Sequence, residues 1–252
     1  MNITIEILGK QIDVKEPSYN DFKKLLKNLT ADDNVSKVFN DFILECTGNE
    51  NFNILEKFIL LLNLRGLILG NMYEVEYEGK NYSLDIDDIL LEFDKKYEIT
   101  TLDINGNKYG FDYVNNFEIS DNKLNFITDS LKVINGKILT LDRSQKETIL
   151  PALNFNEIYD NLIDRLYGTK ININFLNEDI YLFNCLYFLK AIFNTDLLEL
   201  YRLEYVCRKR LNFNSLDFDR CSLPECRILL NYHIEEVKKE NDKAEQLSNR
   251  NR

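Results

Sequence analysis

The chain has 252 residues, of which 31 are Lys or Arg and 42 are Asp or Glu, so its formal net charge is −11 at pH 7. This charge repels phosphate backbones and anionic lipid surfaces, which argues against a general nucleic-acid coat or a membrane binder. With 44% hydrophobic and 29% charged residues, the composition is typical of a folded globular protein and not of a disordered one.

The first residues do not resemble a secretion signal. Residues 1–8 alternate polar and apolar side chains, whereas a signal peptide has a cationic start followed by a continuous apolar run. The most apolar stretches, 58–69 and 180–193, are shorter than the roughly 20 residues that a membrane span needs. Five scattered cysteines are expected to be free thiols in a reducing cytosol, namely Cys46, Cys185, Cys207, Cys221 and Cys226.

One hairpin pattern recurs four times in the first 142 residues: two alternating runs flank a turn that contains Gly. The four segments are 3–14 around Gly9-Lys10, 73–84 around Gly79-Lys80, 101–113 around Asn105-Gly106-Asn107, and 131–141 around Asn135-Gly136-Lys137. Gly and Asn supply the positive φ angles that tight hairpin turns require. We therefore expect at least three β-hairpins, at a spacing too irregular for a solenoid.

Helical patterns lie between the hairpins. Ser18 is a good N-cap for a helix over residues 18–29, and apolar side chains at helical spacing predict a second helix over 35–44. Residues 52–69 are apolar on most sides, which indicates a buried helix. Residues 86–93 fit a short helix better than a strand.

β patterns become rare after Pro151, where one apolar alternation remains at 170–175. Helices are expected over 154–167, 177–193 and 196–211. A capping box from Ser222 to Glu225 begins a last helix, whose final ten or so residues are expected to fray. The sequence thus predicts an α+β fold, with N-terminal hairpins interleaved with helices over 1–150 and a helical domain with a polar C-terminal tail over 151–252.

No pattern predicts a catalytic residue, a cofactor site or a metal ligand. His233 is the only histidine and lies in the apolar stripe of the last helix, which favours packing over acid–base catalysis. Cys207, Cys221, Cys226 and His233 lack the paired spacing of a zinc knuckle. The Gly-rich loops that bind nucleotide phosphates are missing as well. No small-molecule substrate is expected.

A metal-dependent nuclease or hydrolase is the main enzymatic alternative. In that case Glu78-Gly79-Lys80 would be an acid-x-Lys motif, and Asp85 or Asp87 would bind the metal. However, Gly79 lies at a predicted hairpin tip, whereas this chemistry needs side chains presented from a rigid strand. A binding protein that inhibits a host factor is a third possibility.

Three parts of the sequence resemble the T4-type bacteriophage baseplate hub proteins. The opening 5–12, followed by Pro17 and the helical segment 19–29, is similar to the start of that family. The segment 61–70, which leads into 73–77 and then 84–86, is similar to its Leu-Arg, Gly and alternating-strand pattern. The end of the chain, from 205–211 to Pro224-Glu225, resembles phage tail assembly proteins, whereas residues 105–167 have no counterpart in the pattern.

The resemblance implies a structural or assembly protein of a contractile phage tail, located in the virion baseplate and, during assembly, in the host cytoplasm. Its partners would be hub, wedge or tube subunits, and it would have no catalytic residues. The apolar helices 52–69 and 178–193 and the Arg-rich C-terminal end are expected to supply the contacts, although a solvated face would also explain the arginines. The expected partner-interface residues are Leu64, Arg65, Leu67, Phe183, Tyr187, Arg208, Arg210 and Tyr232.

Overall fold

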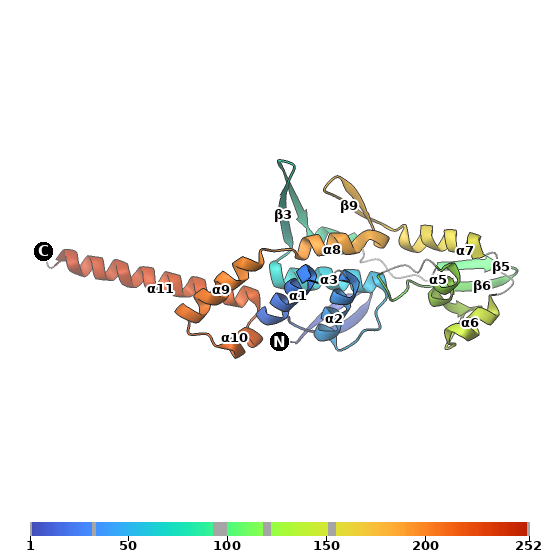
Figure 1. Ribbon diagram of the computed structural model, residues 1–252, viewed down its shortest axis with the longest axis horizontal. Helices are drawn as coiled ribbons and strands as arrows, with labels where there is room; N and C mark the ends of the chain where they lie inside the picture. The colour runs from blue at the N-terminus through green and yellow to red at the C-terminus, as the bar shows by residue number, and fades with distance from the viewer. Residues whose placement is uncertain (1, 32–33, 93–99, 118–121, 151–154, 251–252) are drawn as a thin grey trace.

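The computed structural model describes residues 2–31, 34–92, 100–117, 122–150 and 155–250 (Figure 1). The fold is α+β, with small antiparallel sheets in the N-terminal half and helices in the C-terminal part, as the sequence predicts. Three regions follow one another along the long axis: a lateral lobe (residues 100–112, 122–150 and 155–162), a central body (2–31, 34–92, 113–117 and 163–193) and a C-terminal arm (197–250).

The central body contains three two-stranded sheets and the most buried helices. Its elements are β1 (Asn2–Ile7), β2 (Lys10–Lys15), α1 (Tyr19–Ala31), α2 (Val35–Thr47), α3 (Ile54–Leu69), β3 (Met72–Tyr77), β4 (Lys80–Asp85), α4 (Ile86–Glu92), the π-helix η1 (Ile163–Tyr167), β9 (Lys170–Phe175), β10 (Glu178–Tyr181), the 3-10 helix η2 (Leu182–Asn184) and α8 (Cys185–Phe193).

The lateral lobe and the arm complete the fold. The lobe contains a four-stranded sheet in the order β5-β6-β7-β8, namely β5 (Thr100–Ile104), β6 (Asn107–Phe111), β7 (Leu131–Ile134) and β8 (Lys137–Ile138), with α5 (Lys123–Ser130), α6 (Arg143–Ile149) and α7 (Phe155–Leu162). The arm consists of α9 (Leu197–Arg210), α10 (Ser215–Arg220) and α11 (Leu223–Arg250).

All four predicted hairpins are confirmed, each closed by a two-residue turn in which both residues have positive φ. Their turns are Leu8-Gly9, Glu78-Gly79, Asn105-Gly106 and Asn135-Gly136. In the first two, the turn begins one residue before the predicted Gly-Lys centre. Leu8 and Glu78 therefore adopt left-handed conformations that are unfavourable for their side chains.

A fifth hairpin, β9–β10, corrects the prediction of a helix over residues 177–193. Its turn is Leu176-Asn177, with φ of 52° and 65°, and it contains no glycine. The sequence therefore gives no obvious turn signal there, and Asn177 resembles a helix N-cap. The α-helix of this segment begins only at Cys185.

The helix predictions for residues 18–29, 35–44, 52–69 and 196–211 are confirmed within a few residues. The predicted helix 86–93 is α4, but Phe93 lies outside the described residues, as does Asn154 at the start of the next prediction. The last helix begins at the predicted capping box, where the N–H of Ser222 donates to Glu225 at 2.7 Å. The helix extends to Arg250, and its last turns contain Lys and Glu residues that favour helix.

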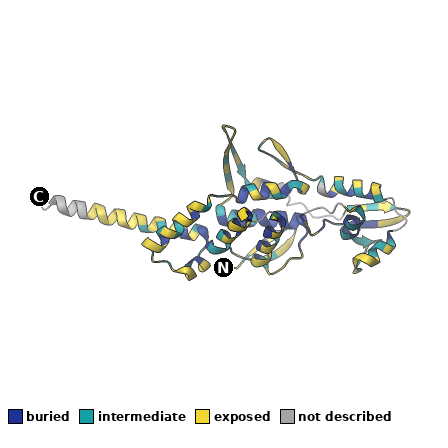
Figure 2. Ribbon diagram, in the orientation of Figure 1, coloured by how far each residue is buried: buried dark blue, intermediate teal, exposed yellow. Residues whose placement is uncertain are grey.

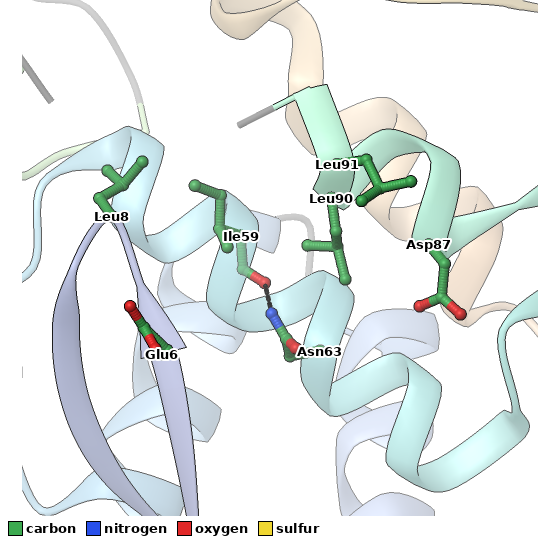
Figure 3. Close-up of a pocket in the computed structure, with 7 residues that line it drawn as sticks. All are labelled: Glu6, Leu8, Ile59, Asn63, Asp87, Leu90 and Leu91. Atoms are coloured by element: carbon green, nitrogen blue, oxygen red, sulfur yellow. Dashed lines mark hydrogen bonds between the residues drawn. The ribbon is translucent and has the colours of Figure 1, made fainter. Parts of the chain in front are cut away.

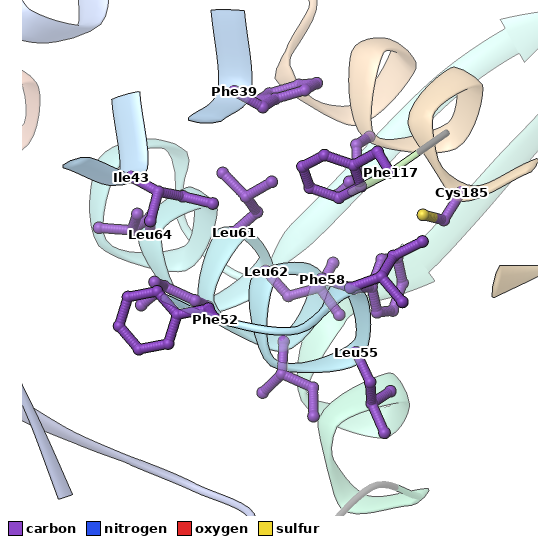
Figure 4. Close-up of a cluster of buried hydrophobic side chains, with 14 of the residues drawn as sticks. Phe39, Ile43, Phe52, Leu55, Phe58, Leu61, Leu62, Leu64, Phe117 and Cys185 are labelled. Carbon is purple, nitrogen blue, oxygen red and sulfur yellow. The ribbon is translucent and has the colours of Figure 1, made fainter. Parts of the chain in front are cut away.

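Helix α3 forms the centre of the hydrophobic core (Figure 4). A capping box between Asn53 and Glu56 starts it, and α2, α4, α8, α11 and β1 pack around it. Aromatic contacts join α8 to this core, with Phe58 and Phe188 ring centroids 6.2 Å apart. The chain itself therefore covers the apolar surface of α3, which is not available to a partner.

The parts predicted on either side of residue 150 pack together. Helix α7 lies beyond this point but packs on α5 in the lateral lobe, where the Phe126 and Tyr159 rings are 5.3 Å apart. Lys123 also donates to Asn156 at 2.9 Å. The buried core includes residues from both predicted domains, from Ile5 to Cys226.

Within the described ranges, no helix combines the length and the apolar character that crossing a lipid bilayer requires.

Candidate protein-interaction surface

Two of the eight predicted interface residues lie inside the molecule, which corrects their assignment. Leu64 is fully buried, and Arg65 is 4% exposed. The Arg65 guanidinium donates to three backbone carbonyls, those of Gly70, Met72 (3.0 Å) and Ile192 (3.3 Å). Arg65 therefore fixes α8 and the start of β3 to the end of α3, and it is not free to bind a partner.

The other six predicted residues do not form one continuous surface. Leu67 is half-buried beside β1, and the exposed rings of Phe183 and Tyr187 lie on η2 and α8. Phe183 stacks on Tyr181, with ring centroids 5.2 Å apart. The remaining three are exposed on the arm: Arg208, Arg210 and Tyr232.

The arm carries most of the exposed apolar side chains of the described residues. Nine of the sixteen large apolar side chains that are exposed lie between residues 198 and 237. We call them the arm apolar surface: Leu198, Tyr201, Tyr205, Leu216, Ile228, Leu229, Tyr232, Ile234 and Val237. Exposed apolar side chains that gather in one region mark candidate contact surfaces for other proteins.

Helical spacing places five of these nine side chains on shared faces. Leu198, Tyr201 and Tyr205 follow one another at intervals of three and four residues, so they lie on one face of α9. Ile228 and Tyr232 are four residues apart on α11 and form a similar pair. Of these five, only Tyr232 is among the interface residues predicted from the sequence. The signal for the others was the same periodicity, which the sequence alone cannot distinguish from a core-facing stripe.

Buried contacts with α1 hold the arm in place. The Tyr19 hydroxyl donates to the Leu200 carbonyl of α9, and the Tyr19 N–H donates to the Cys221 carbonyl at 2.8 Å. The Tyr19 ring also packs on Phe218 of α10, with centroids 5.0 Å apart. Burial raises the pKa of Tyr19, so its hydroxyl stays protonated and remains a hydrogen-bond donor. These contacts attach the base of the arm to α1.

A charged network strengthens this junction. Glu204 of α9 accepts from Lys23 of α1 at 2.6 Å and from Arg208 at 2.9 Å. Although burial opposes it, this hydrogen bonding holds the pKa of Glu204 below its ordinary value. Arg208 lies over the Phe218 ring at 5.1 Å, so this predicted interface residue serves an internal contact. Arg210 makes no ion pair with the described residues and faces solvent.

The outer part of α11 extends beyond the rest of the molecule (Figures 1 and 2). Its predicted stripe is buried at Cys226, is partly covered at Leu230 and His233, and is exposed at Val237. A single helix surrounded by water gains little stability from its own hydrogen bonds, so this part of α11 would be stabilised by packing on another protein. Its apolar side chains are exposed and accessible for such a contact.

The structure separates the residues of the nuclease alternative. Glu78 lies in the β3–β4 turn and Lys80 next to it, whereas Asp85 ends β4 and Asp87 lies in α4. Five residues of extended strand between Lys80 and Asp85 correspond to about 17 Å. These side chains do not converge on one point.

The cysteines and the histidine do not form a metal cluster. Among the described residues, no three His, Cys, Asp or Glu side chains are placed so that they could hold an ion. Cys207 and Cys226 are buried, and burial raises the pKa of Cys226 to about 12. All five cysteines are free thiols.

No protein-family model matches the chain, and no curated protein or solved structure is significantly similar to it. The arm apolar surface and the sequence motifs are therefore the basis for assigning a function.

Proposed function

We propose that this chain is a non-enzymatic structural or assembly protein that acts through protein–protein contacts, in the hub or inner part of a phage tail baseplate. Its partners would be hub, wedge or tube subunits. The observation that carries the proposal is the arm apolar surface, displayed on helices that α1 holds in a fixed position. The baseplate assignment depends on the sequence resemblance.

Docking through the arm has a clear physical basis. Burial of exposed apolar area contributes about 25 cal/mol per Å², and large aromatic side chains supply much of the binding energy of interfaces. Tyr205 and Tyr232 are 62% and 63% exposed, so a partner could cover most of each ring. The contacts of Tyr19 order α9 and α10 before binding, which reduces the entropy lost on association.

The direct test measures solution mass by size-exclusion chromatography with light scattering, for the chain alone and after mixing with hub, wedge and tube subunits of the same phage. We expect a complex with at least one of them. Mass spectrometry of purified virions then distinguishes a permanent subunit from an assembly factor that leaves before maturation. A chain that binds none of these subunits and is missing from both virions and assembly intermediates would contradict the proposal.

Variants locate the contact. Tyr205→Glu and Tyr232→Glu place a charge on the arm apolar surface, so each is expected to weaken the complex by tenfold or more (about 1.4 kcal/mol). Both side chains are exposed, and the circular dichroism spectrum should stay unchanged. Ile138→Glu is the matched control, because Ile138 is 81% exposed but lies in the lateral lobe. An equal effect of all three variants would show that the arm is not the contact.

A host-directed binding protein would use the same surface. In that case the chain would bind a host factor with the same sensitivity to Tyr205→Glu, and it would bind no baseplate subunit.

A further inference from the structure

A groove lies beside the first strand, on the central body (Figure 3). Two adjoining cavities of about 300 and 500 Å³ form it between β1, α3 and α4. We call it the β1 groove and define it by Glu6, Leu8, Ile59, Asn63, Asp87 and Leu90. Figure 3 shows Glu6 and Leu8 on one side, Asp87 and Leu90 on the other, and α3 between them.

The edge of β1 that faces this groove has unpaired backbone groups. Strand β1 pairs only with β2, and the turn Leu8-Gly9 makes Ile7 and Lys10 a hydrogen-bonded pair. Such pairs alternate along an antiparallel ladder, so the N–H and C=O groups of Thr4 and Glu6 point away from β2. No described residue makes a hydrogen bond with these four groups. Thr4 and Glu6 both line the groove.

The groove has apolar hollows suited to the side chains of an added strand. Leu8, Ile59 and Leu90 line one end, and Leu91 beside them is 69% exposed. Alternate side chains of an extended peptide point to the same face, at about 6.6 Å intervals. A peptide paired to Thr4 and Glu6 would place alternate side chains over α3. In this mode of recognition, the backbone supplies affinity and the side-chain hollows supply specificity.

The charge of the groove identifies its occupant as basic. The carboxylates of Glu6 and Asp87 face it from opposite walls, and none of the described residues that line it is Lys or Arg. Asn71 donates to Asp87 at 2.6 Å and holds this carboxylate in place. Gly66 leaves room for Asn71, because a Cβ at this position would lie 2.4 Å from the Asn71 side-chain oxygen.

We propose that the β1 groove binds an extended basic segment of a partner protein, which adds to β1 as a third strand. Apolar side chains of this segment fill the hollow at Leu8, Ile59 and Leu90, and its Lys or Arg side chains pair with Glu6 and Asp87. A second copy of β1 is a poor occupant, because its sequence NITIEI has no basic residue and brings a further glutamate. This site is separate from the arm and does not depend on the baseplate assignment.

Fluorescence anisotropy with synthetic peptides tests the proposal on the full chain. The probe is a labelled peptide of sequence Val-Lys-Val-Thr-Val-Lys-Val, compared with the same peptide carrying Glu in place of both Lys. We expect the basic peptide to bind at least about tenfold more tightly, with half-saturation below about 1 mM. No saturable binding of the basic peptide, or equal affinity for the two peptides, would overturn the proposal.

Two variants with matched controls show whether β1 is the docking edge. Thr4→Pro removes an outward N–H without removing a β1–β2 hydrogen bond, so it should weaken binding by about tenfold. Thr101→Pro is its control, since Thr101 has the same outward position on the edge strand β5 of the lobe. Glu6→Lys leaves one acid and one base in the groove, so it should abolish the preference between the two peptides, whereas Glu74→Lys on β3 should not.

If Thr4→Pro does not fold, the Glu6→Lys variant tests the proposal in its place. This variant should fold, because Glu6 is exposed and makes no hydrogen bond or ion pair with the described residues. An unchanged preference for the basic peptide in Glu6→Lys would overturn the proposal. Binding that survives in a folded Thr4→Pro chain would overturn it as well.

Discussion

Substitution of Arg65 by Met distinguishes a structural role from an interface role. The guanidinium is buried at the end of α3 and satisfies the carbonyls of Gly70, Met72 and Ile192. Burial lowers the pKa of Arg65, but an arginine stays charged at neutral pH. Met fills a similar volume and donates no hydrogen bond, so all three carbonyls lose their partner.

The expected loss of stability follows from these three contacts. Each hydrogen bond to a charged group contributes about 1.5–3 kcal/mol, offset in part because the variant no longer buries a charge. The net loss should be about 3–5 kcal/mol. With a urea m-value of about 3 kcal/mol/M for a chain of this length, the unfolding midpoint should fall by about 1–1.7 M.

The assay is urea unfolding of the isolated chain, followed by circular dichroism at 222 nm. Arg143→Met is the matched control: Arg143 pairs with Asp129 on the surface, and its side chain is 49% exposed. Such a pair contributes about 0–1 kcal/mol, so the midpoint should shift by less than about 0.3 M. If Arg65→Met left the midpoint within that range, the buried anchoring role would be wrong and the interface interpretation would return.

Three further substitutions test the fold and its ion pairs. Phe188→Ala removes a buried ring from the α3–α8 contact and should cost about 3–5 kcal/mol in urea unfolding; a smaller loss than 1 kcal/mol would contradict its central position. Glu78→Asn places Asn-Gly in a turn with φ of 51° and 72°, so stability should rise by about 0.5–1 kcal/mol, and a fall would refute the turn geometry. The folded pKa of Glu204 lies below its ordinary 4.5, so its contribution is present above pH 4.5 and disappears as the pH falls through the folded pKa. The difference in unfolding free energy between wild type and Glu204→Gln should therefore shrink from pH 7 to pH 3. An equal difference at the two pH values would show that the ion pairs of Glu204 do not stabilise the fold.

Local features were predictable because only a few neighbouring residues decide them. The turns at Asn105-Gly106 and Asn135-Gly136 follow from the φ preferences of two residues. The N-terminal caps of α9 at Asp196 and of α11 at Ser222 are also local, because their side chains accept or exchange hydrogen bonds within three positions. The hairpin at Leu176-Asn177 was missed because its left-handed turn has no glycine, and its strands pack on the core.

The sequence by itself determined the α+β class, four hairpins and most helix boundaries. Only the tertiary structure decided which apolar helix faces solvent: α3 is enclosed by the chain, whereas α9 and α11 keep exposed tyrosines. It also placed Arg65 against Ile192, 127 positions away, and Thr4 against a groove formed by α3 and α4. Hydrophobic periodicity shows that one side of a helix is apolar, but what covers that side depends on contacts between distant segments, which no local pattern records.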